Sequence, residues 1–225
     1  MALAASAQEW PQRLPFLRAS AEASVTVKPD EATLQIGVMS KAPTAQAAAA
    51  QNARQLDAVM AELRKAMGPK GDIKTISYAI TPDHRYPKPG QPPEIAGYTA
   101  NNVVQVKTQD LEAVGKLIDS ATASGANRIQ ALQFGLRDEA GARGQALREA
   151  AVKARTQVEA MASALGLRIL RIWAVESGGL GPIQPLHDMA MMARAEAVQV
   201  APPTPVQPGT IEVRATVTLT AQIAH

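Results

Sequence analysis

The alternation of apolar and polar residues is most regular near the end of the chain, from residue 211 to residue 223. Aliphatic residues occupy the odd positions, and charged, hydroxyl or amide residues occupy the even ones. A period of two predicts a strand with one buried face. At ~3.3 Å per residue this strand would be roughly 40 Å long, so its backbone needs a neighbour along its whole length, from this chain or from another copy.

A strand, a helix and a second strand are predicted in close succession between residues 95 and 136. Residues 95–108 favour a strand, and Asp110 is a candidate N-cap for the helix that follows. Gly125 would end this helix, and residues 129–136 alternate again. The apolar stripe of the predicted helix consists of Leu111, Val114, Leu117, Ile118 and Ala121.

The first third of the chain predicts two strands, a helix and a third strand. Strands over residues 21–27 and 32–40 flank a Lys-Pro-Asp-Glu segment, which indicates a hairpin. Thr44 is a candidate cap for a helix over residues 45–67, whose apolar stripe is formed by Leu56, Val59, Met60, Leu63 and Met67. A strand over residues 73–80 is expected to place Ile76, Tyr78 and Ile80 on one face. It is followed by a connection containing Pro82, Pro87, Pro89, Pro92 and Pro93.

A long helix from Asp138 to about Leu165 and a strand over residues 167–175 complete the pattern before a long connection at 176–209. The apolar face of this helix is expected to contain Ala146, Ala150, Val158, Met161 and Leu165. Its acidic residues, Asp138, Glu139, Glu149 and Glu159, are expected to form the solvated face and to interact with the N-terminal dipole. The predicted fold class is α+β, with one continuous, mixed but mostly antiparallel sheet, helices packed on one face, and the order ββαβ-βαβ-αββ. We expect residues 20–225 to form a single domain, preceded by an extended segment over residues 1–19.

Composition narrows the class of protein further. The 225 residues are 46% hydrophobic but only 3% aromatic, so the core must be aliphatic and rich in alanine. A net charge of +3 without interleaved basic and aromatic residues argues against nucleic acid as a partner. The chain has no cysteine, which excludes disulfides and thiol chemistry. No apolar run reaches the ~18 residues of a transmembrane helix.

The N-terminus resembles the end of an export signal. Ala5, Ser6 and Ala7 precede Gln8 and Glu9, and small residues in this spacing are typical of a signal-peptidase site. We therefore interpret the first residues as the remnant of a signal peptide. An ordinary alanine-rich start without structure remains the alternative.

Several segments in fixed order resemble the SIMPL-domain family of bacterial envelope proteins. They are Val27–Ala32, Ile73–Tyr78, Ile95–Val106, Gly125–Ile129, Ala151–Arg155, Ala162–Gly166, Pro205–Gly209 and Ile211–Ala215. The resemblance covers roughly residues 20 to 224. It implies an exported protein of the periplasm, possibly associated peripherally with the outer membrane. It also implies a homo-oligomer, ring- or channel-like, with a link to stress tolerance. The family has no accepted catalytic residues, so the resemblance assigns none.

The residues that could support chemistry are few. His84 follows Asp83, but no nucleophile motif accompanies it, and a solvated loop is the simpler interpretation. His187 with Met189, Met191 and Met192 could bind soft Cu(I), or could form an adaptable apolar contact. The remaining histidine, His225, is terminal, and the glycines at 178–181 lack the lysine of a phosphate loop.

No catalytic, cofactor-binding or metal-binding residue is therefore assigned, and no cofactor is expected. The leading hypothesis is a non-enzymatic envelope protein that self-assembles. The alternative is a binding module for a small ligand or soft metal that uses residues 176–207.

Overall fold

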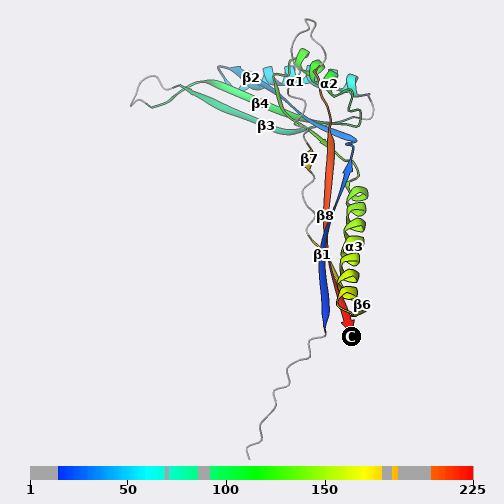
Figure 1. Ribbon diagram of the computed structural model, residues 1–225. Coiled ribbons are helices and arrows are strands. Elements are labelled where there is room, and N and C mark those ends of the chain that lie inside the picture. The colour runs from blue at the N-terminus through cyan, green and yellow to red at the C-terminus, as the bar shows by residue number, and fades with distance from the viewer. Residues whose placement is uncertain (1–14, 69–70, 86–91, 179–183, 187–203, 225) are drawn as a thin grey trace, which may run out of the picture. The chain divides into compact units, whose positions relative to one another are not determined.

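The computed structural model describes residues 15–68, 71–85, 92–178, 184–186 and 204–224 (Figure 1). The predicted α+β class with antiparallel sheets is confirmed. The elements, in chain order, are β1 (Phe16–Val27), β2 (Glu31–Ala42), α1 (Ala45–Met67), β3 (Asp72–Arg85), β4 (Glu94–Thr108), α2 (Val114–Ala123), β5 (Arg128–Gly135), α3 (Glu139–Ala164), β6 (Arg168–Ser177), β7 (Gln184–Leu186) and β8 (Thr210–Ala224).

The strands form two sheets, so the prediction of one continuous sheet is wrong. One sheet has the order β1-β8-β6, with β7 also paired to β8, and the other has the order β3-β4-β2-β5. The chain correspondingly divides into two compact units. Unit 1 contains Met1–Val27, Asp138–Gln184 and Glu212–His225, and unit 2 contains Lys28–Arg137 and Pro185–Ile211. Whether the two units act as the single domain expected from the sequence stays a prediction.

The expected hairpin between the first two strands is also wrong. β1 pairs with β8, whereas β2 pairs with β4 and β5. The turn residues correctly predicted a break between two strands. They could not show that the second strand joins a different sheet, because turn chemistry acts locally and strand pairing does not.

The core of unit 2 lies between its sheet and the helices α1 and α2. Alternate residues of β2 and β4 face these helices, and the most deeply buried members are Leu34, Ile36, Val38, Val104, Val106, Val59, Leu63 and Leu117. The predicted stripe of α1 is confirmed, and Thr44 caps the helix by accepting a hydrogen bond from the backbone N–H of Ala47. α2 begins at Val114, later than predicted, because Asp110 accepts from the N–H of Ala113 in a turn before the helix.

A buried asparagine joins α1 to both central strands of unit 2. Asn52 is fully buried, and its Nδ2 donates to the carbonyl of Val38 in β2 at 2.8 Å and to that of Ala100 in β4 at 3.2 Å. A buried amide needs such partners, because leaving it unpaired costs more than the bond is worth. Asn52 therefore fixes the position of α1 along the sheet.

Unit 1 is built around the terminal strand predicted from the sequence. Odd-numbered residues of β8 from Ile211 to Ile223 are buried, as expected. α3 packs against this sheet through alanines, and the buried set includes Ala19, Ala21, Ala23, Ala150, Ala154, Val158, Val217 and Ala221. Leu165 was expected on the buried face, but it lies beyond the end of α3 and is 64% exposed.

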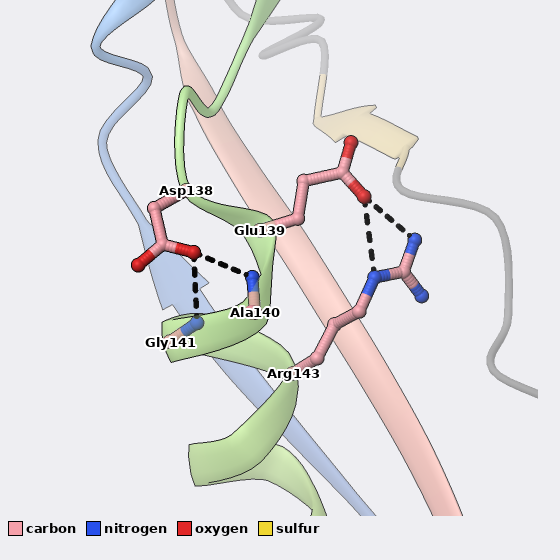
Figure 2. Close-up of polar contacts among 5 residues, drawn as sticks. All are labelled: Asp138, Glu139, Ala140, Gly141 and Arg143. Carbon is pink, nitrogen blue, oxygen red and sulfur yellow. Dashed lines mark hydrogen bonds and ion pairs between the residues drawn. The ribbon is translucent and has the colours of Figure 1, made fainter.

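The start of α3 is stabilised as the sequence predicts. Figure 2 shows the Asp138 carboxylate accepting from the backbone N–H groups of Ala140 and Gly141, while Glu139 pairs with Arg143 one turn later at 2.9 Å. A carboxylate at this end also interacts favourably with the helix dipole. These acidic residues are thus structural, as the sequence indicated.

Among the described residues, none of the helices combines the length and apolar character needed to cross a bilayer.

Candidate functional site

The distinctive surface of unit 2 is an antiparallel ribbon formed by Ser77–Arg85 of β3 and Glu94–Val103 of β4, here called the arm. β2 pairs with β4 only as far as Tyr98, opposite Ala42, whereas β3 and β4 continue to pair to Arg85 and Glu94. β3 lies at the edge of the sheet order (Figure 1). The end of the arm is therefore two-stranded, and β3 has a pairing edge that no described strand occupies.

One face of the arm is apolar and exposed. Tyr78 pairs with Asn102 and Ile80 with Ala100, which places both side chains on the face of the sheet that α1 packs against. Ile95 pairs with His84 on the same side. The exposed fractions of Tyr78, Ile80 and Ile95 are 52%, 36% and 54%. The sequence predicts one face for Ile76, Tyr78 and Ile80. α1 bonds to Val38 and Ala100 at this level of the sheet, but Tyr78 and Ile80 lie on its end strand and stay exposed.

The opposite face of the arm is polar and internally bonded. Asp83 accepts a hydrogen bond from the Thr99 hydroxyl at 2.8 Å, and its carboxylate lies 3.4 Å from Nζ of Lys41. Thr81 pairs with Thr99 on this face. The arm is amphipathic, with a polar surface that is bonded around Asp83 and an apolar surface that no described residue covers. Oδ1 of Asn101 on the polar face and Oδ1 of Asn102 on the other face are buried without a hydrogen-bond partner among the described residues.

His84 does not form the Asp–His pair that the sequence suggested as a possible catalytic base. Asp83 and His84 are adjacent on β3, so their side chains point to opposite faces. The Asp83 carboxylate is engaged by Thr99 and Lys41 rather than by an imidazole. The other candidates, His187, Met189, Met191, Met192 and His225, lie outside the described residues.

Unit 1 contains a shallow groove of about 340 Å³ between α3 and β6. It is lined by Arg155, Val158, Glu159, Ile169, Arg171 and Ile172. Arg155 donates to Glu159 at 2.7 Å, and this bond and the charge of Glu159 raise the pKa of Arg155. On β6, Arg171 stacks on Trp173 at 4.8 Å and donates to Gln222. The charged groups that line this groove are thus engaged with other protein groups.

The described ranges bring together no set of three or more His, Cys, Asp or Glu side chains that could hold a metal ion. The resolved pKa shifts belong to surface ion pairs, Arg155 with Glu159 and Glu212 with Arg214. Paired acids and bases of this kind are the usual product of structural charge networks. β3, in the arm, is one of two end strands that each expose more than one large apolar side chain among the described residues; the other is β6, with Leu170, Ile172, Trp173 and Val175. The arm differs in that its end is a two-stranded ribbon.

These features define an α+β protein of antiparallel sheets whose most distinctive described surface suits contact with another polypeptide. The chain belongs to the SIMPL family, described as a protein of unknown function (DUF541), which matches residues 17–221. The resemblance seen in the sequence is confirmed.

Three relatives illustrate the similarity. The chain is 28% identical over 195 residues to "Uncharacterized protein YggE" of Edwardsiella ictaluri, which covers 87% of this chain and 80% of the relative. It is 28% identical over 198 residues to YggE of Escherichia coli K12, covering 88% and 78%. It is 27% identical over 154 residues to the "26 kDa periplasmic immunogenic protein" of Brucella melitensis, covering 67% and 62%. None of these names specifies a reaction.

Proposed function

We propose that this protein is an exported, non-enzymatic protein of the periplasm that assembles with copies of itself through the arm. The amphipathic arm is the observation that carries the proposal. The compartment is supported by the similarity to the Brucella protein named periplasmic. Association with the cell envelope and a contribution to stress tolerance belong to the same proposal and rest on the family resemblance.

The size of the apolar face sets the expected strength of assembly. The exposed parts of Tyr78, Ile80 and Ile95 amount to roughly 300 Å² per copy, if each side chain offers about 150–250 Å². Burying this area on two copies at ~25 cal/mol per Å² yields about 15 kcal/mol before costs. Association itself costs about 4–15 kcal/mol, so apolar contact alone leaves roughly 0–11 kcal/mol, and backbone pairing along β3 would add to it.

Sedimentation velocity of the purified chain at micromolar concentration tests this proposal. Ile80→Lys places a charge on the apolar face, and Thr81→Lys places the same charge on the polar face of the same exposed strand. We expect the native chain and Thr81→Lys to sediment as oligomers and Ile80→Lys to sediment as a monomer. A monomeric native chain, or equal behaviour of the two variants, would contradict assembly through the arm.

The compartment is tested separately. Osmotic shock of cells that express the complete gene product should release the protein together with periplasmic markers. Retention of the protein with the cytoplasmic fraction would contradict export.

A further inference from the structure

The edge of β3 that no described strand occupies has a defined set of outward-facing backbone groups. In an antiparallel strand, the N–H and C=O of one residue point to the same side, and successive residues alternate sides. Pro82 lies within β3 opposite Tyr98 and has no N–H. A proline fits such a strand when its nitrogen faces away from the ladder. Tyr78 and Ile80 are an even number of residues from Pro82 and therefore point to the same side. Their N–H and C=O groups face outward, whereas those of Ala79 and Thr81 bond to β4.

We infer that the partner of the arm is a second copy of the chain, bound through β3 in a two-fold antiparallel pairing centred on Ala79. In this register, Tyr78 of each copy lies opposite Ile80 of the other. This inference rests on the proposed function, because it specifies the contact by which assembly occurs. The pairing is isologous, so each copy contributes the same surface and the contact closes.

The register follows from the outward groups. Bonded pairs must join outward-facing residues, and the Ala79 centre gives two Tyr78–Ile80 pairs that each exchange both hydrogen bonds. A centre on Ile80 would place Tyr78 opposite Pro82 and lose a donor in each pair. A centre on Tyr78 would place Ile80 opposite Ile76, the extra residue of a β-bulge in β3. The Ala79 centre places Pro82 of each copy opposite Ile76 of the other, so both defects fall in the same flanking pair. The two Tyr78–Ile80 pairs then remain complete, which neither other centre allows.

The side chains suit a second copy. Residues 77–82 carry no charge, so self-pairing brings no like charges together. Tyr78 and Ile80 would meet as aromatic and β-branched cross-strand neighbours, which are favourable pairs. Lys74 lies before this segment and Asp83 after it. Asp72 and Arg85 lie just beyond them, so each end of the segment carries one acid and one base, and antiparallel pairing brings ends of mixed charge together.

Cysteine cross-linking tests the register directly, because the native chain contains no cysteine. At the two-fold axis, Ala79 would face its own copy as a non-hydrogen-bonded pair with Cα atoms ~4.5 Å apart. This separation is within the range of a disulfide. We expect Ala79→Cys to form a covalent dimer under mild oxidation, and the dimer to separate on reduction.

Thr81→Cys is the matched control, since Thr81 is exposed on the same face of the same strand. In the inferred register its two copies are about four residues out of line, or ~13 Å, so it should not cross-link to itself. A mixture of Ser77→Cys and Thr81→Cys chains should instead give mixed dimers, because these positions lie opposite each other.

The outcomes separate this inference from the proposed function. Two outcomes overturn the inferred pairing when the native chain still assembles. Either Ala79→Cys does not cross-link, or Thr81→Cys or Ile80→Cys cross-links as fast as Ala79→Cys. In both cases assembly through the arm remains. If the native chain is monomeric at micromolar concentration, both fail. Circular dichroism of each variant confirms that the comparison is made on folded protein.

Discussion

Replacing Asn52 should destabilise unit 2 more than any exposed change on α1. The Asn52 amide donates to the carbonyls of Val38 and Ala100, and the side chain has no exposed surface. Asn52→Ala removes both bonds and leaves a small cavity between α1 and the sheet. Arg54→Ala is the matched control on the same helix, because Arg54 is exposed.

The magnitude follows from three contributions. Each lost hydrogen bond costs about 1 kcal/mol, and the cavity adds about 1 kcal/mol. The Oδ1 atom of Asn52 is buried without a hydrogen-bond partner among the described residues, so its removal recovers part of the loss. The net expectation is a decrease of about 2–3 kcal/mol in the free energy of unfolding.

Urea denaturation followed by far-ultraviolet circular dichroism measures this change. With a slope of about 1–3 kcal/mol per molar urea, the midpoint should fall by roughly 1–2 M. Arg54→Ala should shift the free energy of unfolding by no more than about 0.5 kcal/mol. An Asn52→Ala midpoint equal to that of the control would refute the role given to this amide.

A charged analogue offers an independent check. Asn52→Asp replaces the donor by a carboxylate oxygen that faces the carbonyls of Val38 and Ala100. Burial and these oxygens should raise the pKa of the new carboxyl above its unfolded value. Above that pKa the carboxyl is charged and destabilises the folded chain. The free energy of unfolding of the variant should therefore approach that of the native chain as the pH falls. A difference in the free energy of unfolding that grows towards acid pH would contradict this geometry.

Three further changes test other parts of the structure. Ala150→Leu should overpack the alanine contacts of α3 and cost about 1–3 kcal/mol in a denaturation experiment. Hydrogen bonds from Arg214 and from a serine lower the pKa of Glu212. Their contribution to stability should be present above the pKa of Glu212 in the unfolded chain and lost as the pH falls through its pKa in the folded chain. Glu212→Gln should remove this pH-dependent part of the stability measured in an acid titration. Gly125 has φ 113°, so Gly125→Ala should cost roughly 1–2 kcal/mol, whereas Gly135→Ala, in open space at an ordinary φ, should be tolerated.

The sequence allowed most elements and buried faces to be predicted, because they depend on local periodicity. The alternation of residues 211–223 predicted β8 and its buried side correctly, and the spacing of Leu56, Val59 and Leu63 predicted the stripe of α1. Thr44 was identified as a cap, and Asp138 as the start of its helix, from their chemistry and position alone. Each of these features is determined within a few residues of the chain.

What the sequence did not reveal depends on contacts between distant segments. The sequence predicts both β1 and β2 as strands with one buried face. Nothing local shows that the alanines of β1 pack against α3 while β2 packs against α1. Tyr78 and Ile80 alternate just as buried residues do, and their exposure depends on the position of β3 at the end of the sheet order. Pro82 was the available signal, since a proline within a strand pattern indicates an edge.

The two-stranded end of the arm has a practical consequence. Backbone amides between Glu94 and Gly97 have one neighbouring strand, whereas those between Val103 and Val106 lie between β3 and β2. An isolated two-stranded ribbon is barely stable in water, so its amides should take up deuterium rapidly when the protein is dilute. The inferred contact lies on β3 instead, so slower uptake by the outward-facing amides of Tyr78 and Ile80 as the protein is concentrated would report the binding of a second copy.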